Sequence, residues 1–401
     1  MKKTGKSIAL TVILIFLGSG IAMAGDAEME QLKQQIQQLT KSMAELEQDK
    51  RAEEASGEPE KKLSLNGVLG GAYQYQDVSD DSEAKNTGDG YIPFQPEIGY
   101  TFTDRDEIFF KLGFTVGKGL GEEAAFNLAP WAAPTEDDVK DINGRNRDYL
   151  LEAWYKHTFE FTENNTLGLT FGILDATGYL DENAYANDEY TQFMNEALVN
   201  GPNGFAPSWD IGGAFQWAYN AVTFNGIIMQ IGENDDGNEY TFGGLQFGYT
   251  LETGLGEGNY RLIMEWGSKD FLNPEGDHLE GRELVFLSCD QEFGDIFGGW
   301  IRFGWGTDDC CVTYSNLYSG GINISGSLWG RAQDNWGIGY GYIDGGNNEI
   351  ESTQVFETYV NFGLSEYFAL TLDVQYMVDD YFDSSNDPKG WILGIRGVTE
   401  F

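Results

Sequence analysis

Scarce charged side chains recur near the middle of segments in which apolar and polar residues alternate, and they fall on the polar side. The cations are Lys111, Lys156, Arg261, Arg302 and Arg396. The carboxylates are Glu152, Glu265, Glu357 and Asp373, with the aromatic residues Trp154 and Tyr359 beside them. Guanidinium and carboxylate groups hydrogen-bond in pairs to a ligand, and flat aromatic rings cover the C–H face of a sugar ring. We therefore expect these side chains to line a path or site for a hydroxyl-rich solute. The alternative is that the charges pair with one another, or with loop carboxylates, and hold a loop in place.

Chemistry that transforms a substrate is not indicated by this sequence. The only histidines are His157 and His278, and neither stands in a Ser–His or similar constellation. The acidic loops do not match the spacing of a calcium loop. The stretch GLGEGN joins two predicted strands, whereas a phosphate loop joins a strand to a helix. The sequence therefore predicts no enzyme, no metal site and no cofactor.

The overall charge and hydropathy exclude further classes of protein. The chain has 401 residues with 24 Lys+Arg and 65 Asp+Glu, a net charge of −41. Nucleic acid is therefore not an expected partner, because binding its phosphates requires basic patches. The mean hydropathy of −0.37 does not suit a helical membrane protein. Only one long apolar run exists, and it lies at the N-terminus.

The N-terminal region divides into three predicted segments. Residues 1–24 resemble a bacterial signal peptide, with three lysines, an apolar stretch and the A-x-A site AMA; the alternative is a retained membrane anchor. Residues 25–51 form a predicted coiled coil, and the alternative is a single amphipathic helix lying on a partner. Its a/d positions are Met29, Leu32, Ile36, Leu39, Met43 and Leu46. Residues 52–62 are charged, contain Gly57 and Pro59, and are predicted to be a linker.

Residues 63–401 show the alternation of β-strands, and the fold class expected is all-β. Sixteen runs are counted, at 63–76, 92–102, 107–117, 148–161, 166–174, 208–219, 221–231, 239–251, 258–267, 282–291, 297–306, 319–330, 333–343, 353–364, 367–378 and 390–401. Most have the length that a tilted strand needs to cross a bilayer. Aromatic residues gather near strand ends, and the polar faces carry charges that a dry core would not tolerate. The pattern predicts a 16-stranded antiparallel transmembrane β-barrel with an aqueous lumen.

Short turns alternate along the chain with long connections, as in outer-membrane barrels. The longest connection, 175–207, breaks the strand alternation, and the spacing of Phe193, Ala197 and Leu198 within it suggests a short helix. We expect this connection to fold into the lumen and constrict it, with 118–147 assisting; the alternative is an exposed outer loop. Its carboxylates are Asp181, Glu182, Asp188, Glu189 and Glu196. They should meet a wall bearing some of the cations, beside a gap that those cations, Glu357, Asp373 and aromatic residues line.

The three cysteines give a test of the strand register. In the predicted register, Cys289 lies near one end of the barrel and Cys310 lies beyond the other end of the next strand. Ten residues of strand span about 33 Å, whereas a disulfide needs Cα atoms within about 7 Å. We therefore predict that Cys289 is unbridged and that Cys310 and Cys311 form at most a local vicinal bond.

Three stretches resemble the carbohydrate-selective porins of the bacterial outer membrane, the OprB type. They are FGILDATGYLDENAYANDEYTQFMNEALVNGP, LEAWYKHTF and ETYVNFGLSEYFALTLDVQYMVDD. The resemblance covers 63–401 and is most specific in 171–202. It implies a sixteen-stranded barrel, usually trimeric, with loops in the lumen and passive uptake of sugars. The chain departs from the family after VQYM, where it reads VDDYF instead of Asn-Pro.

The expected function is selective, passive diffusion of carbohydrates or similar small polar solutes through the outer membrane. The alternative is a general diffusion pore that prefers cations, because acidic vestibules concentrate them. The expected partners are solutes, outer-membrane lipid and two further copies of the chain. A parallel trimeric coil at 29–46 would lie in the periplasm, and the segment 25–51 could contact the cell wall.

Overall fold

The computed structural model describes residues 62–79, 85–383 and 387–401. The segments expected at 1–24, 25–51 and 52–62 lie outside these residues, except for Lys62, the last residue of the expected linker, which begins β1. In the described part, no helix is long and apolar enough to cross a membrane.

Strands account for most of the described chain. Their bounds are β1 (Lys62–Ser79), β2 (Thr87–Thr103), β3 (Asp106–Leu112), β4 (Phe114–Val116), β5 (Leu150–Thr162), β6 (Asn165–Leu174), β7 (Asp210–Tyr219), β8 (Val222–Ile231), β9 (Tyr240–Thr253), β10 (Gly256–Leu272), β11 (Leu279–Phe293), β12 (Phe297–Gly306), β13 (Tyr314–Ser325), β14 (Asn335–Gly345), β15 (Ile350–Gly363), β16 (Phe368–Tyr381) and β17 (Lys389–Glu400). Four short 3₁₀ helices are η1 (Gly121–Glu123), η2 (Ile142–Gly144), η3 (Ala176–Gly178) and η4 (Gly326–Trp329).

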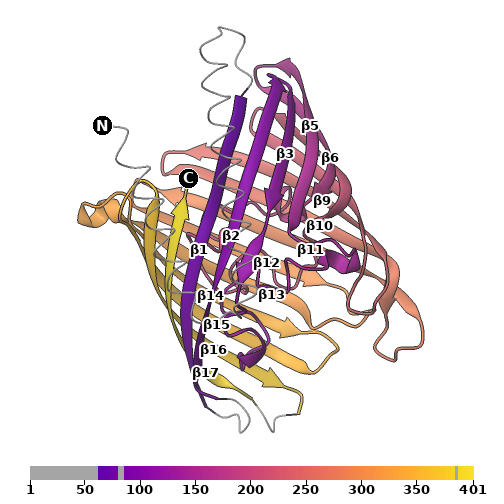
Figure 1. Cartoon of the computed structure of the whole chain (residues 1–401), viewed down its shortest axis with the longest axis vertical. Helices are drawn as coiled ribbons and strands as arrows, with labels where there is room; N and C mark the ends of the chain where they lie inside the picture. Colours follow the sequence, from indigo (N-terminus) through magenta and orange to yellow (C-terminus); the bar gives the residue numbers. More distant parts are fainter. Residues whose placement is uncertain (1–61, 80–84, 384–386) are drawn as a thin grey trace, which may run out of the picture.

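The strands form one antiparallel sheet that closes on itself. Each strand pairs with its neighbours in sequence, and β1 pairs with both β2 and β17. Figure 1 shows the closure, with indigo β1 beside yellow β17. Strands β3 and β4 both pair with β2 and are separated only by Gly113, so they act as one interrupted strand. The described wall is therefore a closed barrel of sixteen strands, as the sequence predicts.

The two ends of the barrel differ in their connections. At one end, which is named the short-turn end, tight turns join the strands. In the turn between β7 and β8, for example, Asn220 adopts a φ of 52°. Asparagine tolerates this left-handed conformation, and paired strands joined by two residues require it. The opposite, long-loop end carries the connections 118–147 and 175–207. These are named the mouth segment and the inner segment.

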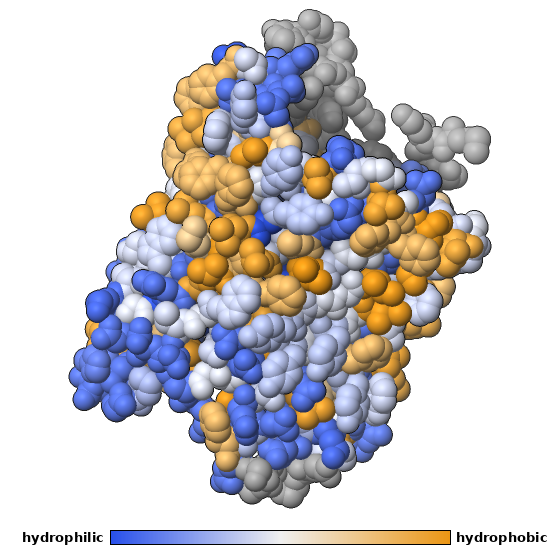
Figure 2. All heavy atoms as spheres, turned by 180° about the vertical axis from the view of Figure 1, so that it is seen from behind, coloured by the Kyte–Doolittle hydropathy of each residue, from blue (hydrophilic) through white to orange (hydrophobic). Residues whose placement is uncertain are grey.

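Side chains alternate between an outer apolar face and an inner face. In β12, Ile301 is 45% exposed, whereas its neighbours Trp300 and Arg302 are buried. Figure 2 shows apolar side chains gathered across the middle of one outer face, with hydrophilic ones concentrated toward the long-loop end. The exposed outer residues include Phe110, Phe171, Ile228, Phe247, Leu287, Tyr340 and Leu393. This distribution matches the lipid-facing band of a membrane barrel.

One predicted strand is displaced. The alternation was assigned to 319–330, but β13 occupies Tyr314–Ser325, and the following residues form η4. The Ser325 hydroxyl accepts a hydrogen bond from the Ser327 backbone N–H, which starts a turn, and Gly330 closes it at φ 79°. Local side-chain bonding of this kind competes with strand pairing.

The cysteines behave as the register predicts. Cys289 is unbridged, and Cys310 and Cys311 are also free thiols. Cys289 stands opposite Tyr260 of β10 and Ile301 of β12, both of which are exposed on the outer face.

Candidate functional site

The inner segment lies against inward-facing side chains of the wall, and its first anchor is Arg302. This side chain is fully buried, and its Nε lies 2.7 Å from Asp181 Oδ2. The contact is an ion pair whose geometry is not that of a hydrogen bond. Arg302 Nη2 donates to the backbone oxygen of Ala186 at 2.8 Å. Arg302 Nη1 also donates to the backbone oxygen of Leu198 at 3.5 Å, so one wall cation contacts three points of the segment.

A second anchor comes from the last three strands of the barrel. The Glu357 carboxylate accepts hydrogen bonds from the backbone N–H groups of Met194 and Asn195, at 2.6 and 2.9 Å. Arg396 donates to the carbonyl oxygens of Glu189 and Gln192, at 2.6 and 2.9 Å. Both wall side chains are fully buried. They satisfy backbone groups that a segment without regular structure leaves unpaired.

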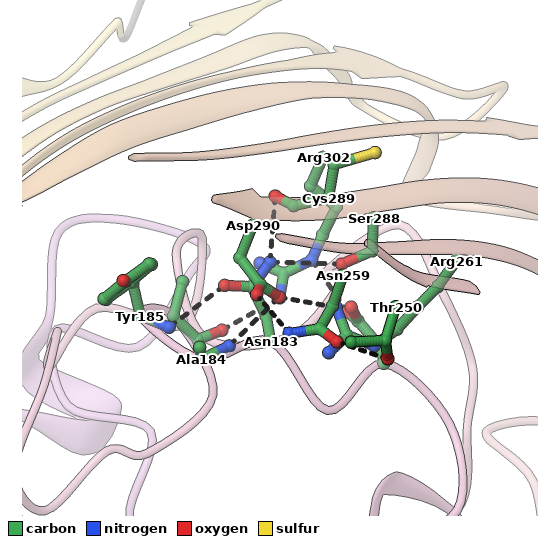
Figure 3. A network of polar contacts seen from close by, with 12 residues as sticks. Asn183, Ala184, Tyr185, Thr250, Asn259, Arg261, Ser288, Cys289, Asp290 and Arg302 are labelled. Atoms are coloured by element: carbon green, nitrogen blue, oxygen red, sulfur yellow. Dashed lines mark hydrogen bonds and ion pairs between the residues drawn. The ribbon is translucent and has the colours of Figure 1, made fainter. Parts of the chain in front are cut away.

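A third anchor is the polar network in Figure 3, which joins the start of the segment to β10 and β11. Asp290 lies at its centre. Its carboxylate accepts hydrogen bonds from Arg261 Nη1 at 2.6 Å, from Asn259 Nδ2 at 3.0 Å and from the Ala184 backbone N–H at 3.3 Å. Asn183 Nδ2 donates to Ser288 Oγ at 3.2 Å.

The segment contains no α-helix, so the helix expected from the spacing of Phe193, Ala197 and Leu198 is wrong. Asn195 Oδ1 accepts from the backbone N–H of Ala197, and Asp188 bonds in the same way to Tyr190. Such side-chain turns compete with helical hydrogen bonds.

The apolar residues of the segment pack against the wall instead of forming a helix face. Phe193 makes edge contacts with Trp300 and Tyr359, at ring-centroid distances of 5.6 and 5.1 Å. A Cβ atom at Gly339 would lie 2.9 Å from Leu198, so this glycine permits the close approach of the segment to β14.

Hydrogen bonds join the mouth segment to the inner segment inside the barrel. Trp131 Nε1 donates to the Glu189 carbonyl oxygen at 2.8 Å, and the Glu196 carboxylate accepts from the Ala129 backbone N–H at 3.0 Å. Gln375 Nε2 of β16 donates to the Pro130 carbonyl oxygen at 2.8 Å. The two segments and the β16 wall are therefore linked by direct hydrogen bonds.

Three cavities follow one another along the two segments, and in the second and third of them β2 and β3 contribute to the lining. The first, of about 450 Å³, lies at the long-loop end and shares Ala132, Pro134, Ser208 and Trp209 with the second. The second, of about 460 Å³, shares Gln95, Lys111, Asn187 and Glu189 with the third. The third, of about 540 Å³, reaches Glu366 and Phe401 at the short-turn end. Adjacent cavities thus have lining residues in common along the height of the barrel.

The four residues common to the second and third cavities are named the narrow ring. Gln95 and Lys111 come from the wall, and Asn187 and Glu189 from the inner segment. Lys111 Nζ lies 3.7 Å from Glu97 Oε1. Burial and the carboxylate of Asp188 raise the pKa of Glu189 to about 7. The ring therefore combines one ammonium group, two neutral amides and a carboxyl group that titrates near neutral pH.

The predicted site residues fall into separate places. Those lining the three cavities are Lys111, Asp181, Asp188, Glu189, Glu196 and Glu265. Those lining a fourth cavity, named the recess, are Lys156, Glu182 and Arg261. Those buried beneath the inner segment are Arg302, Glu357, Tyr359, Asp373 and Arg396. Glu152 stands opposite Lys111 in the β3–β5 register and accepts a hydrogen bond from Trp154 Nε1 at 3.0 Å.

The expected gap differs from the arrangement found. Arg302, Glu357, Asp373 and Arg396 were expected beside the open gap, but each is at most 2% exposed. Arg302, Glu357 and Arg396 hold the inner segment, which was the alternative interpretation of these charges, whereas Asp373 accepts a hydrogen bond from Gln375 of β16. Gln95 and Asn187 were not singled out from the sequence. The alternation of β2 could have identified Gln95, which shares its face with Glu97.

A closed, sixteen-stranded antiparallel barrel with a long connection bound to its inner wall has the fold of the porins. The solved structure of Pseudomonas putida OprB at high pH matches it with a TM-score of 0.63 at 12% identity, over 84% of this chain and 94% of that one. A Rh. blastica porin mutant matches with a TM-score of 0.51 at 14% identity, over 85% of this chain and all of that one. The resemblance to OprB-type porins is thus confirmed at the level of the fold.

Sequence comparison gives a relative without an assigned role. An uncharacterized protein of Aquifex aeolicus (strain VF5) is 29% identical over 311 residues, which cover 76% of this chain and 85% of that protein. No family model matches the chain.

Proposed function

We propose that this chain is an outer-membrane porin that lets carbohydrates or similar small polar solutes diffuse passively along the three cavities. The inner segment, 175–207, is the constriction. The short-turn end faces the periplasm, where the N-terminal segment also lies, and the barrel assembles as a homotrimer in outer-membrane lipid. The observation that carries the proposal is the series of cavities that share lining residues, of which the second and third meet at the narrow ring.

The composition of the ring suits small polar solutes. Lys111, Gln95, Asn187 and Glu189 together offer hydrogen-bond donors and acceptors at one level of the lumen. The Oδ1 atom of Asn187 is buried without a hydrogen-bond partner. A passing hydroxyl group would satisfy it and would be released easily, since selective conduction needs binding that is favourable but weak.

A matched pair of tryptophan substitutions tests this path. Gln95→Trp places a bulky indole group at the narrow ring. Thr223→Trp places the same group on the inner face of β8, in the recess. We expect Gln95→Trp to lower single-channel conductance and slow sugar uptake into liposomes, and Thr223→Trp to change neither. Equal effects of the two substitutions on conductance would show that solutes do not follow the three cavities.

Excision of the constriction gives a second test. A variant lacking 181–200 should conduct ions better and lose its preference among sugars of similar size. Wild-type conductance and wild-type sugar block in this variant would mean that the segment does not limit flow.

The second candidate function is a general pore that prefers cations. The cavity at the short-turn end supports it, because its lining includes Glu97, Asp188, Glu189, Glu366 and Glu400 but a single cation, Lys111. Such a lining raises the local concentration of cations. Reversal potentials in a KCl gradient distinguish the two. A strong potassium preference without sugar block of the current favours the cation pore.

A further inference from the structure

The recess is a fourth cavity of about 350 Å³ on the other side of the inner segment from the proposed path. Its wall is a belt of inward-facing side chains on six consecutive strands, β5 to β10. The belt is continuous in register: Gly168 stands opposite Gln216, Gln216 opposite Asn225, and Asn225 opposite Gln246. Glu182 of the inner segment also lines it. Among the described residues, none that lines the recess also lines the three cavities of the path.

The recess is closed toward the long-loop end. Beyond Asn225 on β8, the inward side chains of Ile227, Met229 and Ile231 are buried in an apolar cluster with Leu180 and Phe242. A Cβ atom at Gly244 would lie 2.5 Å from Leu180, so the inner segment touches the β9 backbone there. The lining instead extends to Ala218 and Thr250, close to the turns of the short-turn end. A blind cavity of this kind can hold a solute but does not conduct it.

The lining is polar, and its charges balance. Lys156 Nζ donates to Gln216 Oε1 at 2.9 Å, which leaves two of the three ammonium protons for other acceptors. Arg261 is paired with Asp290 at 2.6 Å. The negative charge of Glu182 then offsets the positive charge of Lys156, so the recess as a whole favours a ligand without net charge. Around these groups lie the hydroxyls of Thr158, Thr166, Thr223 and Thr250 and the amides of Gln216, Asn225, Gln246 and Asn259.

The position of the lining groups is fixed by contacts outside the cavity. Asn225 Nδ2 donates to the Tyr179 carbonyl oxygen at 3.1 Å, and Gln246 Oε1 accepts from the Asp181 backbone N–H at 2.8 Å. These bonds orient both amides and leave the second polar atom of each for a ligand. Space comes from small residues, since a Cβ atom at Gly248 would lie 2.2 Å from Thr223 Oγ1. Preorganised polar groups around a cavity are typical of small-molecule sites.

We propose that the recess is a non-conducting binding site for a neutral, hydroxyl-rich solute about the size of a monosaccharide. Mixed hydroxyl, amide, ammonium and carboxylate groups can each donate to or accept from the hydroxyls of such a ligand. Its entry from the periplasm rests on the orientation given in the proposed function, whereas binding itself does not depend on conduction.

Saturation-transfer NMR with D-glucose on the purified, detergent-solubilised full chain tests the proposal. Lys156→Met removes one charged hydrogen-bond donor and should weaken glucose binding about tenfold, without changing ion conductance. Thr223→Trp fills the cavity and should abolish glucose binding in the recess, which leaves only the weak binding proposed for the narrow ring. Gln95→Trp, which obstructs the proposed path, should leave glucose binding in the recess intact. Circular dichroism and heat-modifiable migration on gels establish that each variant is folded.

The outcomes separate this inference from the proposed function. Weaker binding in Lys156→Met and loss of the recess binding in Thr223→Trp, with retention in Gln95→Trp, support the recess even if the protein proves not to conduct sugars. Wild-type affinity in both recess variants, or binding that disappears only in Gln95→Trp, overturns the recess and places the ligand in the path. Gluconate and glucosamine carry a net charge and should bind more weakly than glucose. Stronger binding of either overturns the assignment of a neutral ligand.

Discussion

Arg302→Met should release the start of the inner segment. The substitution removes a fully buried guanidinium group and leaves the Asp181 carboxylate, itself 6% exposed, without its ion-pair partner. It also removes the hydrogen bond from Arg302 to the Ala186 carbonyl oxygen. Removal of one partner of a buried pair costs about 3–5 kcal/mol. Strand pairing holds the wall together independently of this ion pair. We therefore expect the lost free energy to destabilise only the docked inner segment, so that the segment opens more often while the wall stays folded.

The magnitude can be measured by hydrogen exchange. A cost of 3–5 kcal/mol corresponds to an increase of about 150- to 5,000-fold in the population of the open segment. Amides that bond to the wall, such as those of Asp181, Met194 and Asn195, should lose protection by this factor. Single-channel traces should show larger and noisier conductance, since the constriction would move.

Two controls make the interpretation specific. Lys269→Met removes the cation of an exposed pair between β10 and β11, in which the side chains of Lys269 and Glu280 are 75% and 28% exposed, and such pairs contribute little to stability. Its exchange and conductance should match the wild type. The double variant Arg302→Met with Asp181→Asn leaves no unpaired buried charge and should recover much of the protection. If Arg302→Met alone left exchange and conductance unchanged, the buried pair would not hold the segment.

Three further predictions concern the ring and the N-terminal segment. Lys111→Met removes the only cation of the narrow ring. One charge at close range in water is worth about 1 kcal/mol, so the potassium-to-chloride permeability ratio should rise about fivefold. An unchanged ratio would place Lys111 off the path. The raised pKa of Glu189, about 7, means that its charge appears as the pH rises through 7, so cation preference should increase between pH 6 and 8. The folded state holds this proton more tightly than the unfolded state. Protonated Glu189 therefore contributes fully to folding stability below the ordinary carboxyl pKa, and this contribution is lost as the pH rises through about 7. In Glu189→Gln, both the cation preference and the folding stability should depend less on pH. Deletion of 26–51 should leave conduction intact and lower the heat resistance of the proposed trimer, measured by unheated gel electrophoresis, whereas loss of conduction would assign the segment to the pore.

The wall could be predicted from the sequence because its physics is local. Alternation in segments such as YFALTLDVQYMV records which side chains face lipid, and it holds wherever strands pair without interruption. It fails at 319–330, where the Ser325 hydroxyl bonds to the backbone and ends β13 early. It also cannot detect the break at Gly113, since a residue without a side chain shows no polarity.

The arrangement of the lumen could be predicted only in part, because it depends on contacts between distant residues. The cations and carboxylates of the inner face were identifiable from alternation. Nothing in the sequence distinguished Lys111, which lines the cavities, from Arg302, which is covered, because that depends on which wall the inner segment meets. Asn187 has no spacing or charge that marks it, and the turns at Asp188 and Asn195 determine its position.

The attachment of the inner segment to the last strands constrains the order of assembly. Glu357 and Arg396 bind residues that precede them by more than 160 positions, and both belong to strands made late in synthesis. Contacts between residues so far apart in sequence form slowly, because the chain between them must first be ordered. Until the segment docks, the barrel would hold these side chains without their backbone partners. Ring closure between β1 and β17 and capture of the segment should therefore be coupled, so that an insertion intermediate with an unfinished wall has a wide, unfiltered lumen.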